Sequence, residues 1–321
     1  MAKDKSNYSI NKSTILVDKF MSQLIVIGGI SVILAVMGIL LFISWEIFPL
    51  GQKAEVSSLS KIDVQGQGFE QVLLDEWSSM AGLADKQGIT FVDLKNPKKQ
   101  KKESFVAPDE GQVTAIFYSQ ENQVLVIGTD HGQFSLLTIE YRRQASGRYL
   151  EDGREEMTVL YDLEQTEYFD LAPGRKVTQI AYGSTDESKM VAAIVEKNGK
   201  KGLHCVTLKQ EVDLFGGESE LAVAEEQDLT SLLSAQPEKL LVSNQADSLL
   251  VATSEAKVDC FKLEDDEMTR FHQVSPFAEN PGVKISSIDY IFGNSTFVVN
   301  GSNGQMLGYS LFYDQKAKQR L

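Results

Sequence analysis

The chain has 321 residues, which is enough for two average domains or for one large all-β domain. Its content of 42% hydrophobic and 24% charged residues is ordinary for a folded chain and excludes wholesale disorder. A net charge of −14 would repel a phosphate backbone and argues against nucleic acid as a partner, and two cysteines are too few for a disulfide scaffold.

Near the N-terminus, residues 24–45 form an uncharged apolar run, LIVIGGISVILAVMGILLFISW. A helix of this length spans about 33 Å, which is sufficient for the hydrocarbon core of a bilayer. The run is longer than the roughly 7–15-residue apolar region of a signal peptide, and the bulky segment SWEIFPL follows it where a peptidase needs small residues. The sequence therefore predicts one uncleaved transmembrane helix over residues 21–49.

The charges around this helix predict its orientation. Lys12 and Lys19 precede it, and the next basic residue is Lys53, so the N-terminus is expected in the cytoplasm. The predicted organisation is a cytoplasmic segment 1–20, the helix, a linker 50–70 and an extracytoplasmic domain 71–321. Trp45 and Phe48 are expected to act as interfacial anchors, and Pro49 to end the helix.

Beyond the linker the sequence is β-rich and repetitive. Each copy has an apolar strand, a polar turn, a second apolar strand, a tight turn and a third alternating strand; the copies are 113–139, 177–208, 240–263, 285–312 and a partial one at 81–94. Repeats of this kind predict an all-β, β-propeller-like domain with blades of the WD40 or quinoprotein type. Where successive repeats are spaced further apart along the chain, the extra residues are expected to lie in loops at 140–170 and 209–228.

Glycines at the second turn of four copies, Gly88, Gly132, Gly199 and Gly304, are expected to adopt positive φ. Five blades are visible. Two arrangements remain open at this point: a small propeller closed by residues 55–75, or the front part of a longer protein.

The sequence contains few candidate functional residues. Its three histidines, His131, His204 and His272, lie in different repeats, and the motifs GxSxG, GxxxxGK[ST], HExxH and CxxC do not occur. We therefore expect no enzyme activity, no metal site and no cofactor. Cys205 and Cys260 could pair in an oxidising compartment, but their apolar surroundings favour two buried thiols.

One basic run stands out in the acidic domain. KNPKKQKK contains five lysines in residues 95–102, namely Lys95, Lys98, Lys99, Lys101 and Lys102. These side chains are candidate contacts for anionic headgroups or for the acidic face of a partner protein. The simpler interpretation is a solvated loop between two blades.

Several features of the N-terminal region match a known family. Asp18–Lys19, the glycine pair at 28–29 and the helix exit Trp45–Leu50 resemble the N-terminal half of the long-form permease subunit of bacterial phosphate ABC transporters. In that family a large extracytoplasmic insertion with propeller-like repeats follows the first helix, and further permease helices come after it. No second hydrophobic run follows residue 50 in this sequence, so no functional residue of the transport path is carried over.

The resemblance implies a docking or regulatory domain of a phosphate permease, located in the inner membrane of a bacterium with the main domain in the periplasm. Its implied partners are the membrane, a second permease subunit, ATPase subunits and a periplasmic phosphate-binding protein. The alternative is a stand-alone membrane-anchored propeller that serves as a scaffold for envelope protein assembly. A propeller enzyme would need catalytic groups that converge in space, which the scattered histidines do not supply.

Overall fold

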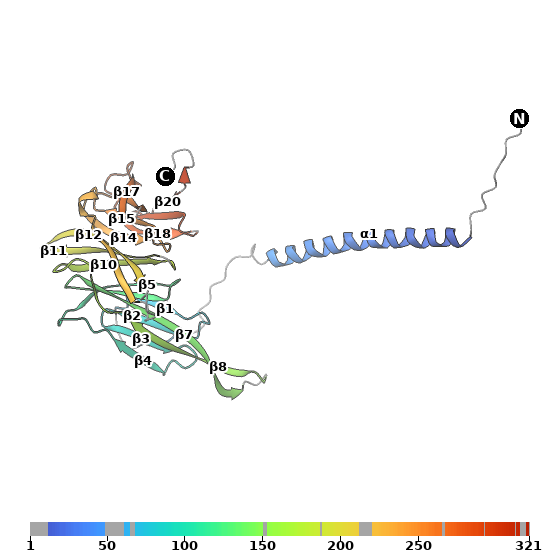
Figure 1. The fold of residues 1–321 in the computed structure, drawn as a ribbon, viewed down its shortest axis with the longest axis horizontal. Coiled ribbons are helices and arrows are strands. Elements are labelled where there is room, and N and C mark those ends of the chain that lie inside the picture. The colour runs from blue at the N-terminus through green and yellow to red at the C-terminus, as the bar shows by residue number, and fades with distance from the viewer. Residues whose placement is uncertain are drawn as a thin grey trace, which may run out of the picture. The chain divides into compact units, whose positions relative to one another are not determined.

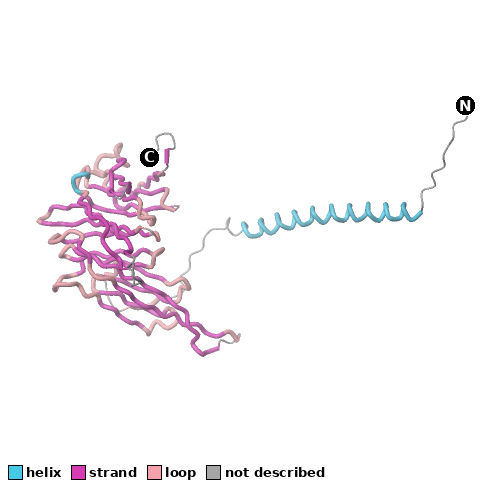
Figure 2. Tube along the Cα trace, in the orientation of Figure 1, coloured by secondary structure: helices cyan, strands magenta, loops and turns pink. Residues whose placement is uncertain are grey.

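The structure is a computed structural model, and it describes residues 12–48, 61–64, 68–149, 153–186, 188–211, 220–264, 267–291, 293–311, 313–314 and 319–320. The chain divides into two compact units, Met1–Ile62 and Asp63–Leu321. The first unit contains the long helix α1, and the second consists almost entirely of strands and turns (Figures 1 and 2).

Helix α1 runs from Lys12 to Ile47, so it begins before the predicted start at residue 21. Its segment Ile15–Ile47 is long and apolar enough to cross a membrane, a property that membrane anchors share with signal sequences, and none of its most apolar window is buried within the chain. At 1.5 Å per residue these 33 residues extend about 50 Å, well over the thickness of a hydrocarbon core.

Among its described residues the second unit has five antiparallel sheets of three or more strands, and the main run of strands in each lies in sequence order. The first sheet is β1 (Gln71–Leu74), β2 (Met80–Asp85), β3 (Gly88–Asp93) and β4 (Gln100–Ser104). The second is β5 (Val113–Ser119), β6 (Val124–Thr129), β7 (Gln133–Tyr149) and β8 (Glu155–Gln165), with the short β9 (Phe169–Asp170) also paired to β7.

The remaining three sheets repeat this pattern. The third is β10 (Lys176–Ser184), β11 (Lys189–Lys197), β12 (Lys200–Glu211) and β13 (Glu220–Asp228), followed by the short helix η2 (Thr230–Leu232). The fourth is β14 (Pro237–Val242), β15 (Ser248–Thr253), β16 (Val258–Glu264) and β17 (Glu267–Val274). The fifth has three strands, β18 (Ile285–Ile291), β19 (Thr296–Gly301) and β20 (Met306–Ser310), and β21 (Tyr313–Asp314) pairs separately with β22 (Gln319–Arg320).

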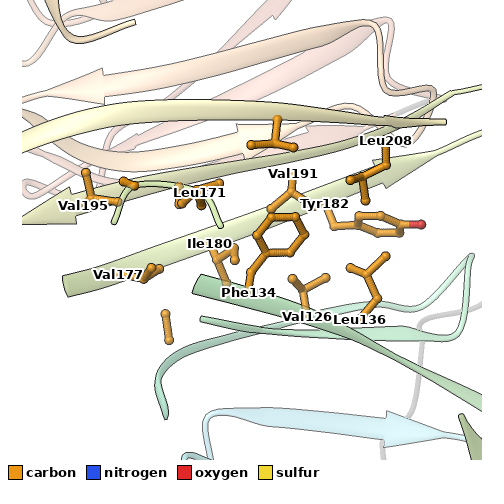
Figure 3. Packing of buried hydrophobic residues seen from close by; sticks show 14 of the residues in the cluster. Val126, Phe134, Leu136, Leu171, Val177, Ile180, Tyr182, Val191, Val195 and Leu208 are labelled. Carbon is orange, nitrogen blue, oxygen red and sulfur yellow. The ribbon is translucent and has the colours of Figure 1, made fainter. Parts of the chain in front are cut away.

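The sheets pack face to face as propeller blades. The first strands of consecutive sheets contact one another, β1 with β5, β5 with β10, β10 with β14 and β14 with β18. Four hydrophobic clusters fill the spaces between consecutive sheets, and Figure 3 shows the one between the second and third. The prediction of an all-β, propeller-like domain preceded by one apolar helix is confirmed.

The second strand of each inner sheet explains why the sequence shows continuous apolar runs there. In β6 all six residues are buried, because Val124 and Val126 enter one cluster while Leu125 and Ile127 enter the other. By contrast β19, in the last sheet, alternates between buried and partly exposed residues. A strand in an inner blade is covered on both faces by the neighbouring blades, whereas a strand in the first or last of the five blades is covered on one face.

The five blades follow one another along the domain, from β1–β4 at its lower end in Figure 1 to β18–β20 at its upper end. Residues 71–74 form β1 and pair with β2, so this part of the proposed closing segment 55–75 belongs to the first blade. Residues 55–60 and 65–67 of that segment lie outside the described residues.

Two predictions about turns and loops need correction. Gly132, Gly199 and Gly304 do adopt positive φ, but Gly88 does not. A glycine is required at position 88 because a Cβ there would lie 2.1 Å from the Glu103 carbonyl oxygen.

The expected loop at 140–170 is wrong for most of its length, since β7 and β8 extend as a long hairpin through residues 149 and 155. Most of 209–228 also belongs to strands, β12 and β13.

Candidate functional site

The basic run at residues 95–102 lies within the first blade, which corrects the expectation of a loop between blades. Lys95 begins the turn after β3, where the Asp93 carboxylate accepts hydrogen bonds from the backbone N–H groups of Lys95 (3.0 Å) and Asn96 (3.1 Å). Lys101 and Lys102 lie on β4 and therefore point to opposite faces of the sheet. The five lysines do not form one continuous patch.

Lys101 is neutralised within the fold. Its Nζ lies 2.8 Å from Oε1 of Glu103 and 5.6 Å from the centre of the Tyr161 ring. The Tyr161 hydroxyl donates to the same Glu103 oxygen (3.1 Å), and its ring stacks on Phe91 with centroids 3.8 Å apart. Burial, followed by the Glu103 carboxylate, raises the pKa of Tyr161 to about 12. This cluster joins the first two blades, so it has a structural role.

Lys102 donates to the side-chain oxygen of Gln87 (3.3 Å), and Lys98 is exposed. Lys95 and Lys99 instead line a cleft of about 560 Å³ between the first blade and the long β7–β8 hairpin. We call this space the hairpin cleft. The hairpin contributes Gln144, Arg148, Glu156 and Met157 to it, and Lys95 Nζ donates to the Met157 carbonyl (3.4 Å).

The β7–β8 hairpin projects beyond the rest of its sheet (Figure 1). From Arg142 to Tyr149 the side chains of β7 are exposed, so this part of the strand does not contribute to the cores between blades, whereas Tyr141 still packs against the cluster between the first two blades. The guanidinium of Arg143 lies 5.3 Å from the ring centre of Trp77, which fastens the base of the extension to the turn between β1 and β2. Arg142 forms an ion pair with Asp162 across the two strands. The hairpin therefore presents an exposed surface beside a polar cleft.

The predicted interfacial anchors lie at the end of α1. Trp45 is within the helix and Phe48 follows its last residue, and the side chains of both are exposed in the absence of lipid. Pro49 lies outside the described residues.

One polar cluster in the structure was not predicted from the sequence. Nη1 of Arg175 lies 3.0 Å from Nε2 of His204, and the same ring nitrogen lies 3.3 Å from Oδ2 of Asp228. Burial lowers the pKa of His204. The negative charge of Asp228 acts in the opposite direction but has the smaller effect, so the pKa is lowered overall. For Asp228 burial is outweighed by hydrogen bonds from Thr230 and by the charges of His204 and Arg175, so its pKa is lowered.

This cluster does not assemble a catalytic triad. Oγ1 of the neighbouring Thr230 accepts the backbone N–H of Leu203 (3.0 Å), and Thr230 N donates to Asp228 (3.0 Å). The three histidines lie in separate sheets or turns, and among the described residues no group of three or more His, Cys, Asp or Glu side chains could hold a metal ion.

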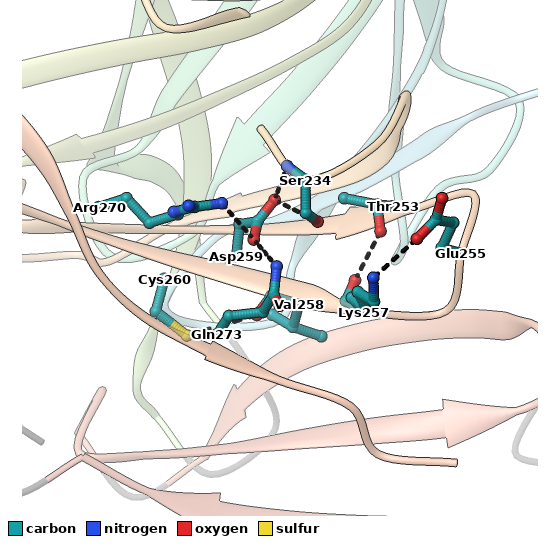
Figure 4. Close-up of polar contacts among 9 residues, drawn as sticks. All are labelled: Ser234, Thr253, Glu255, Lys257, Val258, Asp259, Cys260, Arg270 and Gln273. Carbon is teal, nitrogen blue, oxygen red and sulfur yellow. Dashed lines mark hydrogen bonds and ion pairs between the residues drawn. The ribbon is translucent and has the colours of Figure 1, made fainter. Parts of the chain in front are cut away.

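A second buried polar cluster is centred on Asp259 of β16, which is fully buried. Its carboxylate accepts hydrogen bonds from the backbone N–H and hydroxyl of Ser234 (2.8 and 2.9 Å) and from the Gln273 amide (2.7 Å), and Arg270 lies 3.4 Å away (Figure 4). These contacts tie the loop that enters the fourth blade to its third and fourth strands. Every partner is satisfied, so the cluster is structural rather than a binding site.

No protein-family model and no curated protein matches this sequence. Among solved structures it is similar to the β-propeller domain of Cps50 (Swd1) from Myceliophthora thermophila, with 12% identity, a TM-score of 0.42 and coverage of 72% of this chain and 66% of that one. It is similar to Hsv2 from Kluyveromyces marxianus, with 14% identity, a TM-score of 0.44 and coverage of 83% of this chain and 72% of that one. It is also similar to the WD40 domain of SCAP from fission yeast, with 14% identity, a TM-score of 0.43 and coverage of 78% of this chain and 54% of that one. The chain thus spans between about half and three quarters of their lengths, and at this level of similarity they carry no conclusion about its function.

Proposed function

We propose that this chain is a membrane-anchored domain of a bacterial phosphate ABC transporter permease, acting in docking or regulation and not in catalysis. The observation that carries the proposal is the order of its parts: one uninterrupted apolar helix of membrane-spanning length, followed by a unit of five propeller blades. This is the arrangement that the resemblance in the N-terminal region implies. Propellers present large surfaces to partners, and their function depends on those surfaces.

In this proposal residues 1–20 lie in the cytoplasm, 21–49 cross the inner membrane, 50–70 form a linker and 71–321 lie in the periplasm. Lys12 and Lys19 in the N-terminal part of α1, with no lysine or arginine in its apolar core, support this orientation. Trp45 and Phe48 then lie at the periplasmic interface of the bilayer.

The hairpin cleft is the proposed docking surface. Its lining combines cations from the first blade, Lys95 and Lys99, with the exposed hairpin, and Lys98 adds a further cation at the same turn. A partner with an acidic segment beside a flat polar surface would complement it. The partners expected at this periplasmic surface are a periplasmic phosphate-binding protein and a second permease subunit, and the ATPase subunits would join the complex from the cytoplasmic side.

Affinity purification of the full chain from native membranes in mild detergent tests this function. Recovery of permease, ATPase and phosphate-binding subunits supports it, whereas recovery of envelope assembly proteins supports the alternative, a stand-alone scaffold. The charge-reversed variant Lys95→Glu/Lys99→Glu should lose the partner. The control Lys86→Glu/Lys284→Glu changes the same number of exposed lysines elsewhere and should retain it. Equal recovery with both variants would exclude the hairpin cleft as the docking surface.

A further inference from the structure

A second cleft lies on the third blade, about 520 Å³ in volume, and it contains an excess of positive charge. We call it the cationic cleft. Four cationic residues line it, Arg175, Lys197, Lys200 and Lys201, against one carboxylate, Asp228. In a chain of net charge −14 such a local excess is opposite in sign to the whole. The hairpin cleft and the membrane anchor play no part in it.

The β11–β12 hairpin places two of these lysines side by side. Asn198 (φ 53°) and Gly199 (φ 76°) form a two-residue turn with positive φ at both positions, the conformation that favours tight hairpins. Lys197 and Lys200 flank this turn and are directly paired across the two strands. Residues two apart on a strand share a face, so Lys200 lies on the same face of β12 as His204.

The fold also fixes the position of Arg175. Its guanidinium contacts His204 (3.0 Å) and Asp228 (3.7 Å). Its side chain stays about one third exposed, so the guanidinium is held and yet open to the cleft. Gly202 makes room for this arrangement, because a Cβ there would lie 3.3 Å from Nη1 of Arg175 and 2.7 Å from Oγ1 of Thr230.

The backbone next to Arg175 is held by the second blade. Gly174 N donates to the His131 carbonyl (2.9 Å), and Ala172 N donates to the Gly132 carbonyl (2.9 Å). Gly132 is packed so closely that a Cβ would lie 1.9 Å from the Ala172 carbonyl oxygen. The arginine therefore projects from a segment clamped between two blades, which reduces the entropy lost when a ligand binds.

The three lysines supply charge that the fold does not use. Lys197 and Lys200 are exposed and Lys201 is partly exposed, and no ion pair within the described part of the chain involves any of them. Asp228 contacts only Arg175 of the four cations, while Lys201 alternates to the opposite face of β12 from Lys200 and has Glu196 as its cross-strand partner. A planar guanidinium beside the two exposed ammonium groups of Lys197 and Lys200 is suited to oxyanions, which accept charge-assisted hydrogen bonds from both.

We propose that the cationic cleft is a binding site for a phosphate-bearing anion. Arg175 supplies the fixed donor, and Lys197 and Lys200 close over the anion from the hairpin. The same chemistry would recognise a free phosphate or the headgroup of an anionic phospholipid. Asp228 disfavours anions close to itself and so directs the ligand towards the lysine hairpin.

Isothermal titration of the full chain in detergent tests this site with two probes, pyrophosphate and a short-chain phosphatidylglycerol below its micellar concentration. Binding of pyrophosphate indicates a free anion, and binding of the lipid alone indicates a headgroup. In either case Lys197→Gln/Lys200→Gln should weaken binding about tenfold or more, because two charged donors are lost. Lys197→Arg/Lys200→Arg should retain it.

The matched control is Lys86→Gln/Lys284→Gln, which removes the same charge from exposed lysines outside the cleft and should leave binding unchanged. A thermal unfolding curve of each variant establishes that it is folded. Binding of neither probe, or equal binding by the Lys197→Gln/Lys200→Gln variant and the parent chain, would overturn the proposal. Copurification of permease subunits does not depend on this result, so the two proposals fail separately.

Discussion

Gly183 of the third blade lies directly against the backbone of Ser243 in the fourth. A Cβ at Gly183 would lie 1.9 Å from the Ser243 carbonyl oxygen, and Ser184 N donates to the next carbonyl, that of Asn244 (3.1 Å). Adjacent blades therefore meet through backbone at this point, and no side chain can be inserted between them.

The substitution Gly183→Ala should accordingly lower the free energy of unfolding by about 2–3 kcal/mol, the usual cost of overpacking a rigid site. Gly308→Ala is the matched control, because a Cβ there meets nothing within 4 Å. Denaturant unfolding of both variants measures the difference. A Gly183→Ala protein as stable as the Gly308→Ala protein would show that the two blades can separate without cost.

The buried carboxylate of Asp259 should contribute more to the free energy of unfolding than a charge on the surface. Asp259→Ala leaves the Ser234 N–H and the Gln273 amide without an acceptor, and we expect a loss of about 3 kcal/mol. Glu255→Gln, which alters an exposed ion pair with Lys257, should cost less than about 1 kcal/mol. Equal unfolding midpoints for the two variants would contradict the structural role of the Asp259 cluster.

His204 should make stability depend on pH below neutrality. Its pKa is lowered in the folded protein, mainly by burial, so the unfolded chain binds the proton more tightly. The stability contributed by the neutral ring is fully present above the ordinary histidine pKa of about 6.5. It is lost as the pH falls from that value through the lower pKa of the folded state. His204→Gln should flatten that part of the profile. A parent chain whose unfolding midpoint rises from pH 7.5 to pH 5.5 would contradict this sign.

Cys205 and Cys260 should be unreactive until the domain unfolds. Both are buried free thiols, as the apolar surroundings in the sequence predicted. Burial raises the pKa of each to about 12, with the Asp259 charge as a further cause for Cys260. At pH 8 the thiolate is the reactive form and is almost absent. A chromogenic disulfide reagent should therefore label neither cysteine in the native chain and both in guanidinium chloride; rapid native labelling would contradict the packing of the blades.

The repeated three-strand unit could be predicted from the sequence because its information is local. Turn residues such as Gly132, Gly199 and Gly304 fall between apolar strands, and strands such as β6 are apolar throughout because both faces are covered. The outer strands were missed, since β4 and the extension of β7 and β8 are polar and gain their order from pairing with a neighbour. Polar composition alone does not distinguish such a strand from a loop.

The candidate sites could be predicted only in part, for a similar reason. A run of lysines is visible in sequence, but strand alternation sends Lys101 and Lys102 to opposite faces, and the Glu103 carboxylate neutralises one of them. The cluster of Arg175, His204 and Asp228 draws on segments far apart in the chain. His204 and Asp228 meet as cross-strand partners on β12 and β13 of the third sheet, and Arg175 reaches them from the segment before β10, which the second blade holds.

The central claim, a periplasmic blade domain held by an uncleaved α1, is tested most directly by cysteine accessibility in intact cells. Because both native cysteines are buried, a cysteine introduced at exposed Glu121, in the turn between β5 and β6, provides a specific label. We expect a membrane-impermeant maleimide to label Glu121→Cys in cells with a permeable outer membrane, and Ser6→Cys only after lysis, with both proteins remaining in the membrane fraction after carbonate washing. Labelling of Ser6→Cys but not of Glu121→Cys in intact cells, or release of the blade domain into the soluble fraction, would contradict the account.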